Sequence, residues 1–395
     1  MAAAHDLKNW ITHVQSPRVE KWLKDAAKSD TISLAGGLPS EELFPTEDLS
    51  EALQKVIAEH AIEALQYSWP EGYQTLRDQI AQRITARGMP AEPNEILITH
   101  GAQQALDLVA KLLVRAGDRI ALESPTYAPA IQAFDMYRPV FVPLQRTREG
   151  LDIQQVEDVL KHERPKLIYL IATGHNPTGL SLPHQSRTKL ADILAALDAY
   201  VIEEDAYGEL QYDHPQKPIN AILKSPRHIF VSSFSKILSP GLRLGWIAAP
   251  ESLIKELTLI KQAADLQSAS LNQLVLSTYL SNASLDEQVK HCITFYRERR
   301  DCMVECAARY FPPEVQWSRP DSAFSLWVQL PAHVDADSLL NDAIKDAQVA
   351  FEPGNPYFPV NASPHFIRLS FSSNDCSTLR TGMDRLGKIL ADRVT

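Results

Sequence analysis

Short apolar runs rich in β-branched residues alternate with helix-length segments through the middle of the chain, and this alternation limits the fold more than any other feature. Helical patterns over residues 103–115, 153–162 and 186–197 separate several of these runs. Strands separated by helices predict a mostly parallel sheet with helices on both faces. We therefore expect an α/β fold with a seven-stranded central sheet. Its expected strands are residues 96–99, 119–123, 140–143, 166–172, 200–204, 228–232 and 244–249.

The chain of 395 residues is long for a single hydrophobic core, because such cores stop growing near roughly 250 to 300 residues. After about Ser270 the pattern changes to long helices, over 272–282 and 285–310, and then to strands at 325–329 and 365–370. This change predicts a second domain. The expected parts are an N-terminal segment packing on the rest of the fold (1–45), a large domain (46–270) and a smaller α+β domain (271–395).

Charge and composition exclude several classes of protein. A formal net charge of −10 without a basic stripe argues against a nucleic-acid-binding surface. No apolar run approaches the ~18 residues of a membrane span, and the first residues lack the pattern of a leader, so we expect a cytoplasmic protein. Cys302 and Cys306 share a helical face near His291, but buried thiols are favoured over a metal site, and no metal is expected.

The segment Ser233-Phe234-Ser235-Lys236 directly follows an expected strand, and Arg243 comes seven residues later. Sites in such sheets lie beyond the carboxyl ends of the strands. The lysine offers an amine that can form a Schiff base with an aldehyde, while the hydroxyls and the guanidinium offer donors for a phosphate. The segment thus indicates a site for pyridoxal phosphate (PLP). For this short motif alone, a turn with a surface lysine is the alternative.

Other motifs follow one another along nearly the whole chain. In order they are ISLAGGLP (32–39), LFP (43–45), QYS (66–68), GY (72–73), LR (76–77), GAQQA (101–105), ESPTY (123–127), NPTG (176–179), DAYGEL (205–210) and IRLSF (367–371). Together with the lysine motif, they make the chain similar to the class I aminotransferases of PLP fold type I. The resemblance is nearest to the branch of the 2-aminoadipate and kynurenine aminotransferases and the enzyme-like domain of MocR regulators.

The resemblance implies roles around the cofactor. Lys236 matches the Schiff-base lysine, which also moves a proton at the substrate Cα. Tyr127 matches the ring stacked on the pyridine, and Asn176 and Tyr207 match the donors to its phenolic oxygen. The residues that match the phosphate site are Ser233, Ser235, Arg243 and, through their backbone N–H groups, Ala102 and Gln103.

The resemblance also implies a substrate site and a partner. Arg368 matches the residue that clamps the substrate α-carboxylate, a task suited to a bidentate guanidinium, although a lone rim arginine in a salt bridge is the alternative. Gly37, Asn176 and His175 are expected on the substrate side. Tyr67 matches a residue that reaches the phosphate of a neighbouring subunit, which implies a homodimer with shared sites.

One departure concerns the carboxylate at the pyridine nitrogen. Relatives usually place an aspartate three residues before the tyrosine, whereas this chain has Glu204 at that spacing from Tyr207. Either Glu204 holds the nitrogen protonated or Asp205 has taken the role. Neighbouring strand residues point to opposite faces, so both cannot serve.

Further departures lie close to the expected site. Ala102 replaces a hydroxyl residue, and His175 stands beside Asn176 either as an acid or base or as a hydrogen-bonded wall residue. Ser322-Ala323 replaces a glycine pair. Where some relatives carry an arginine for a dicarboxylic side chain, this chain has Glu20, with Arg18 two residues away.

We expect an aminotransferase that moves an α-amino group between an amino acid and a 2-oxo acid in a ping-pong cycle through pyridoxamine phosphate. An enzyme of the same fold with another outcome is the alternative: decarboxylation, β- or γ-elimination or replacement, or carbon-carbon bond formation. A ligand-sensing domain like that of MocR proteins is disfavoured, because no DNA-binding domain precedes the resemblance and the lysine is present.

Overall fold

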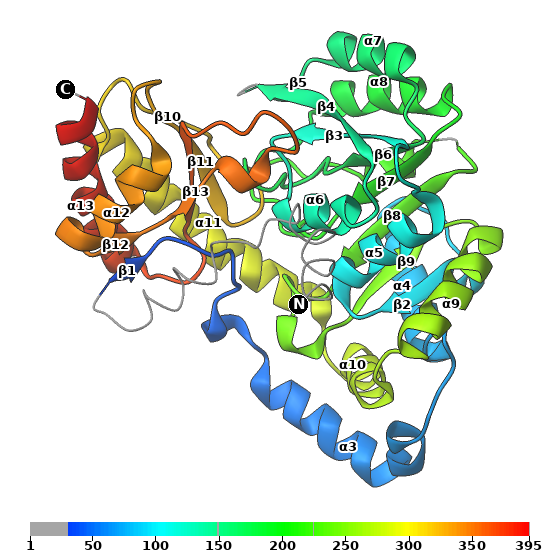
Figure 1. Cartoon of the computed structure of the whole chain (residues 1–395). Helices are drawn as coiled ribbons and strands as arrows, with labels where there is room; N and C mark the ends of the chain where they lie inside the picture. The colour runs from blue at the N-terminus through cyan, green and yellow to red at the C-terminus, as the bar shows by residue number, and fades with distance from the viewer. Residues whose placement is uncertain (1–30, 148–149, 224, 395) are drawn as a thin grey trace, which may run out of the picture.

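The computed structural model describes residues 31–147, 150–223 and 225–394, and its largest element is a sheet of eight strands (Figure 1). Apolar and β-branched side chains fill these strands, which suits a sheet that is buried on both sides. The strands are β2 (Ile96–Thr99), β3 (Arg119–Ser124), β4 (Val140–Thr147), β5 (Gly150–Leu151), β6 (Leu167–Leu170), β7 (Tyr200–Glu204), β8 (His228–Ser233) and β9 (Gly245–Ala248).

The strand order is β2-β9-β8-β7-β6-β3-β4-β5. Strands β3, β4, β6, β7 and β8 pair in parallel, whereas β9 runs antiparallel to both β2 and β8. The mostly parallel sheet is therefore confirmed. It has one strand more than expected, because the two residues of β5 pair antiparallel with the end of β4.

Helices cover both faces of this sheet, as expected. Leu167 and Tyr169 of β6 belong to one hydrophobic core, and Ile168 and Leu170 belong to another on the opposite face. The first core includes α5 (Gly101–Leu113), α6 (Ala128–Asp135) and α9 (Glu251–Asp265), and the second includes α7 (Ile153–Glu163) and α8 (His184–Ala195). The carboxyl ends of the parallel strands therefore remain available for a site.

The C-terminal part forms its own sheet at one end of the molecule (Figure 1). Its strand order is β10-β11-β14-β13, and a separate short pair joins β1 to β12 in parallel. The elements are β1 (Ile32–Ser33), β10 (Gln316–Trp317), β11 (Ser325–Gln329), β12 (Val349–Ala350), β13 (Glu352–Pro353), β14 (Phe366–Ser370), α11 (Leu285–Tyr310), α12 (Ala336–Ala347) and α13 (Cys376–Val394). The β1–β12 pair ties the start of the described chain to this end of the protein.

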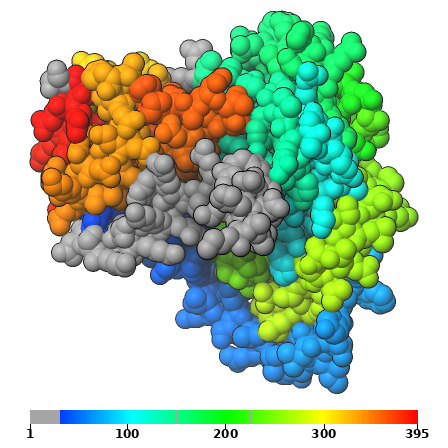
Figure 2. Space-filling model, in the orientation of Figure 1, coloured from blue at the N-terminus to red at the C-terminus, as the bar shows by residue number. Residues whose placement is uncertain are grey.

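A further group of helices forms an edge that projects at the bottom of the molecule in Figure 2. Helix α3 (Thr46–Leu65), which is kinked at His60, packs against α10 (Ser270–Asn282), and α4 (Gln74–Ala86) packs beside them. The short 3-10 helices are η1 (Glu41–Leu43), η2 (Pro93–Glu95), η3 (Ile219–Ala221), η4 (Pro240–Leu242) and η5 (Asn355–Tyr357).

No helix in the described part of the chain is long and apolar enough to cross a membrane. Within the same residues, no group of three His, Cys, Asp or Glu side chains is arranged to hold a metal ion. Cys292, Cys302 and Cys306 are buried free thiols.

Candidate active site

A cavity of about 270 Å³ lies at the carboxyl ends of the parallel strands and reaches Arg368 on β14. The loops that follow β7 and β8 supply much of its wall, because each strand ends at this edge of the sheet. The cavity brings together these residues singled out from the sequence: Gly37, Ala102, Gln103, Tyr127, Asn176, Glu204, Tyr207, Ser233, Ser235, Lys236, Arg243 and Arg368.

Lys236 projects into this cavity from the turn after β8. Its Nζ donates a hydrogen bond to the Gly37 carbonyl oxygen at 2.9 Å and lies 5.6 Å from the ring centroid of Tyr207. Burial, together with the positive charges of Arg368 and Arg243, lowers the pKa of Lys236 to about 8, although Glu204 opposes the shift. A substantial fraction of this amine is therefore neutral near pH 8, so it can act as a nucleophile or a base.

Glu204, at the end of β7, is the carboxylate that faces the cavity. Burial raises its pKa to about 7, while a hydrogen bond from the Tyr169 hydroxyl and the charge of Lys236 act in the opposite direction. The neighbouring Asp205 lies outside the cavity lining, and its carboxylate pairs with Arg87 Nη2 at 2.5 Å. Neighbouring residues of an extended chain point to opposite sides, so Glu204 faces the cavity and Asp205 points away from it.

A cradle for an anion lies where α5 begins. The backbone N–H groups of Ala102 and Gln103 are in the first turn, where a helix offers donors without partners inside the helix. Arg243 Nη2 donates to the His100 carbonyl oxygen at 3.1 Å, which holds the guanidinium beside this turn. A Cβ at Gly101, which has φ +73°, would lie 2.8 Å from Arg243 Nη2, so this close approach requires glycine.

Tyr127, Asn176 and Tyr207 supply the walls between the cradle and Arg368. Burial raises the pKa of Tyr207 to about 12, so its hydroxyl stays protonated and can donate a hydrogen bond. Asn176 Oδ1 is buried without a hydrogen-bond partner among the described residues. A buried amide oxygen of this kind needs a partner, and a ligand in the cavity would supply one.

Arg368 closes the other end of the cavity. Its Nε donates to Ser325 Oγ at 3.1 Å, and its Nη1 donates to Glu352 Oε2 at 2.6 Å and to the Tyr357 hydroxyl at 3.0 Å. Gly37 lies against the same side chain, and a Cβ at this position would collide with Arg368 Nη2.

Two other residues singled out from the sequence lie away from the cavity. His175 is fully buried, its Nδ1 lies 2.9 Å from Thr178 Oγ1, and burial lowers its pKa well below the ordinary value. This position favours the wall interpretation over an acid or base. Tyr67 is 77% exposed after the end of α3. Arg18 and Glu20 are outside the described residues.

Sequence reasoning missed Glu352, Tyr357 and Ser325, the three partners of Arg368. Glu352 stands directly opposite Arg368 in the pairing of β13 with β14. The sequence signal for Glu352 is a carboxylate within a short apolar segment. A strand of two residues, such as β13, shows no periodic pattern from which its pairing with β14 could be predicted.

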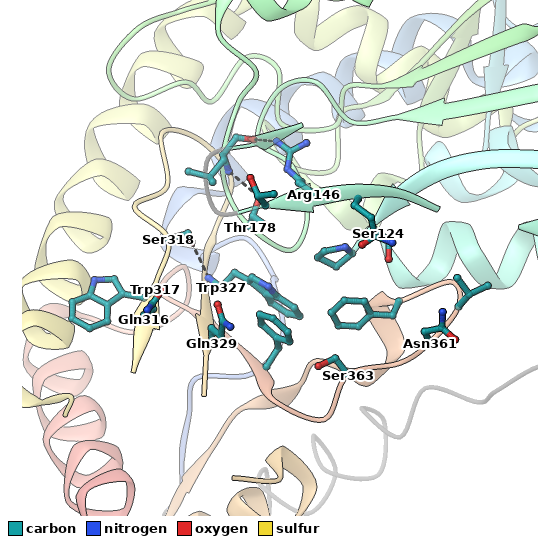
Figure 3. Close-up of a pocket in the computed structure, with 17 residues that line it drawn as sticks. Ser124, Arg146, Thr178, Gln316, Trp317, Ser318, Trp327, Gln329, Asn361 and Ser363 are labelled. Atoms are coloured by element: carbon teal, nitrogen blue, oxygen red, sulfur yellow. Dashed lines mark hydrogen bonds between the residues drawn. The ribbon is translucent and has the colours of Figure 1, made fainter. Parts of the chain in front are cut away.

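A second cavity, of about 490 Å³, lies between the ends of β3 and β4 and the C-terminal sheet (Figure 3). Its lining includes four aromatic side chains, Trp317, Trp327, Phe358 and Phe366, and the Trp327 ring stacks on Phe366 with centroids 5.3 Å apart. Arg146 is the charged residue among those that line it, and Arg146 pairs with the buried Glu123. The larger cavity thus lacks the amine and carboxylate that give the smaller one its chemistry.

Comparisons with known proteins agree with this geometry. Residues 29–386 match the family model of the aminotransferases of class I and II. The 2-aminoadipate transaminase of Thermus thermophilus is 37% identical over 381 residues, which cover 95% of this chain and 94% of that protein. The aromatic-amino-acid aminotransferase 1 of Thermococcus litoralis is 34% identical over 388 residues, which cover 96% of this chain and 93% of that one.

Among solved structures, the kynurenine aminotransferase of Pyrococcus horikoshii, in complex with PMP, superimposes with a TM-score of 0.93 at 32% identity. The match covers 98% of this chain and 97% of that one. The expected PLP fold type I is therefore confirmed. The chain belongs to the class I and II aminotransferases, enzymes that transfer amino groups with pyridoxal phosphate as their cofactor.

Proposed function

We propose that this aminotransferase moves the α-amino group of an amino acid to a 2-oxo acid, and that Lys236 carries the proton at the substrate Cα. The observation that supports this most is the shared cavity: Lys236 Nζ faces a carboxylate, Glu204, and a buried guanidinium, Arg368. A base, an electrostatic partner and a carboxylate-binding group are the three parts that such a transfer needs.

The cavity fits pyridoxal phosphate. The cradle formed by Arg243, Ser233, Ser235 and the first turn of α5 suits its phosphate, and the unpartnered Asn176 Oδ1 lies in the same cavity. When bound, the cofactor supplies an aldehyde that takes up the amino group and a ring that accepts electrons from the carbon losing a proton. Lys236 would hold the aldehyde end, and Tyr127 and Tyr207 would line the ring.

Glu204 has the position to hold a proton on the nitrogen of that ring. Its burial without a guanidinium partner is the reason why its pKa is raised to about 7. A positively charged ring nitrogen beside it would favour the ionised carboxylate again. We therefore assign the nitrogen-binding role to Glu204, because Asp205 is already paired with Arg87.

The homodimer is also a proposal, and an exposed apolar surface supports it. Ile62 is 87% exposed and Trp69 is 74% exposed, on the same projecting edge as Leu65 and Tyr67. Monomeric proteins rarely leave several large apolar side chains together in solvent. A second copy of this chain would cover the surface and bring Tyr67 to the neighbouring site. We also propose a cytoplasmic location and the domain boundaries at about residues 45 and 270.

Reduction with borohydride tests the role of Lys236. We expect the cofactor to become fixed to the peptide that contains Lys236, and Lys236→Arg to abolish both the fixation and amino-group transfer. Lys261→Arg is the matched control, because Lys261 is a buried lysine on α9 that pairs with Asp265 at 2.9 Å outside the cavity. Label on a peptide without Lys236 would show that the assignment is wrong.

A further inference from the structure

The guanidinium of Arg368 is largely occupied by groups of the chain itself. Both donors of Nη1 are used, one on Glu352 Oε2 at 2.6 Å and one on the Tyr357 hydroxyl at 3.0 Å. The Nε donor is used on Ser325 Oγ at 3.1 Å. Only Nη2 has no hydrogen bond to the residues that the structure describes, and it lies against Gly37 at the cavity.

Glu352 is held in its position beside Arg368 by burial and by hydrogen bonds. It is 3% exposed and lies directly opposite Arg368 in the β13–β14 pairing. Its Oε1 accepts a hydrogen bond from the Gly36 N–H at 2.9 Å, and its Oε2 accepts one from the Tyr357 hydroxyl as well as from Arg368. Gly36 and Tyr357, which come from two separate segments, therefore hold this carboxylate on the guanidinium of Arg368.

Two consequences follow for a substrate carboxylate. It can reach Arg368 through Nη2 alone, so the two parallel bonds of a bidentate arginine–carboxylate pair are not available. The charge of Arg368 is also balanced by Glu352 before any substrate arrives. The free energy gained by binding an α-carboxylate is therefore smaller here than at an unpaired arginine.

On the basis of the proposed function, we propose that this enzyme also takes amino groups from primary amines without an α-carboxylate, and that Glu352 is the residue that permits this. The amines are compounds of the form R–CH2–NH2, such as decarboxylated amino acids. Glu352 acts through Arg368 and is a specificity-determining residue.

The reaction balances without a further reagent. The carbon–nitrogen bond of the amine breaks, its nitrogen passes to the carbonyl carbon of the cofactor, and one carbon-bound proton of the donor moves through Lys236 to that same carbon. The donor loses two electrons and leaves as the aldehyde R–CHO, whose oxygen comes from water. The two electrons would pass to the bound cofactor, giving pyridoxamine phosphate. One water molecule would be released when the amine condenses with the cofactor aldehyde, and one would be consumed when R–CHO is released, so no net water is used.

Matched pairs of donors test the proposal in the wild-type enzyme. The half-reaction without an acceptor is measured for L-phenylalanine and 2-phenylethylamine, L-leucine and 3-methylbutylamine, and L-tryptophan and tryptamine. One charge-assisted hydrogen bond to the carboxylate raises kcat/KM by about tenfold to hundredfold, and the factors for two such bonds would multiply. We expect the best amine to reach kcat/KM within about a hundredfold of its amino acid, the upper value for one such bond. A larger gap, or no conversion of any amine, overturns the proposal, whereas no conversion of amino acids and amines alike overturns the proposed function instead.

Glu352→Gln then tests the residue. The variant keeps the shape and an acceptor for Arg368 but removes the balancing charge. We expect the preference for the amino acid over the amine to widen by about tenfold or more, through a lower KM for the amino acid. Glu209→Gln is the control, since Glu209 pairs with Arg83 outside the cavity. An unchanged or narrower preference in Glu352→Gln contradicts the assignment.

A binding measurement separates this effect from catalysis. 3-Phenylpropanoate carries a carboxylate and a ring but no amino group, and its affinity for the cofactor-free protein can be measured by calorimetry. We expect about tenfold tighter binding to Glu352→Gln than to the wild type, and no change in Glu209→Gln. Weaker or equal binding to Glu352→Gln would mean that Glu352 only supports the structure around Arg368.

Discussion

Glu204→Gln should stabilise the cofactor-free protein while it impairs the reaction. Glu204 is 4% exposed, and burial raises its pKa from the ordinary 4.5 to about 7. At 1.36 kcal/mol per pH unit, that difference in pKa corresponds to about 3 kcal/mol. This is an upper value for the free energy of unfolding that the wild type loses when Glu204 must ionise in the folded protein. Glutamine keeps an acceptor for the Tyr169 hydroxyl and removes this loss.

The sign of the pH dependence follows from the raised pKa. Below pH 4.5 Glu204 is protonated in both the folded and the unfolded chain, so the variant and the wild type should differ little. Between pH 4.5 and about 7 only the unfolded chain ionises, and the stability of the wild type falls relative to the variant. Above pH 7 the difference should stay constant at about 1 to 3 kcal/mol in favour of Glu204→Gln.

Denaturant unfolding of cofactor-free protein between pH 4.5 and 9, followed by tryptophan fluorescence, measures this difference. Asp205→Asn is the matched comparison and should have the opposite effect at the alkaline end of this range, because burial raises the pKa of Asp205 and the ion pair with Arg87 requires its ionised form. It leaves the buried Arg87 without its partner, and breaking a buried pair costs about 3 to 5 kcal/mol. In the loaded enzyme, removal of the Cα proton should be severely slowed in Glu204→Gln. Destabilisation by Glu204→Gln that does not depend on pH would show that burial does not raise the pKa of Glu204 in the folded protein.

Three further results are expected. Arg243→Ala removes a charged donor from the anion cradle and should raise the dissociation constant of pyridoxal phosphate by about tenfold to hundredfold, measured by equilibrium dialysis; retention equal to the wild type would disprove the phosphate assignment. Gly37→Ala should displace the Arg368 guanidinium and reduce kcat/KM for amino acids by about tenfold to hundredfold, with normal cofactor binding by absorbance; an unchanged kcat/KM would contradict the contact. Equal amounts of inactive Tyr67→Ala and Lys236→Ala chains should recover about a quarter of the wild-type activity through mixed dimers, whereas no recovery after verified subunit exchange would count against shared sites.

Most of the cavity could be predicted from the sequence because its residues follow strands that are easy to recognise. Lys236, Glu204 and Asn176 each stand at or just beyond the end of an apolar run, and parallel strands carry such residues to one edge of a sheet. The three-residue spacing before Tyr207 favoured Glu204 over Asp205, and Glu204 lines the cavity, whereas Asp205 pairs with Arg87.

The partners of Arg368 could not be predicted in the same way. Glu352 meets Arg368 through the register of β13, a strand of two residues with no periodic pattern to reveal it. The short β5 was missed for the same reason. The start of α5 at Gly101, two residues earlier than expected, depends on a positive φ that only the folded chain displays. The role proposed for Tyr67 requires a neighbouring chain, which a single sequence describes only by resemblance.

The half-reaction without an acceptor distinguishes amino-group transfer from the other reactions that a PLP enzyme of this fold can catalyse. Enzyme loaded with pyridoxal phosphate is mixed with an amino acid, and the cofactor form and the products are measured by absorbance and mass spectrometry. We expect a single turnover that leaves pyridoxamine phosphate and one 2-oxo acid per site, and recovery of the starting spectrum when a 2-oxo acid is added. Repeated turnover without an acceptor, with carbon dioxide, an eliminated group or a coupled product appearing, would contradict it.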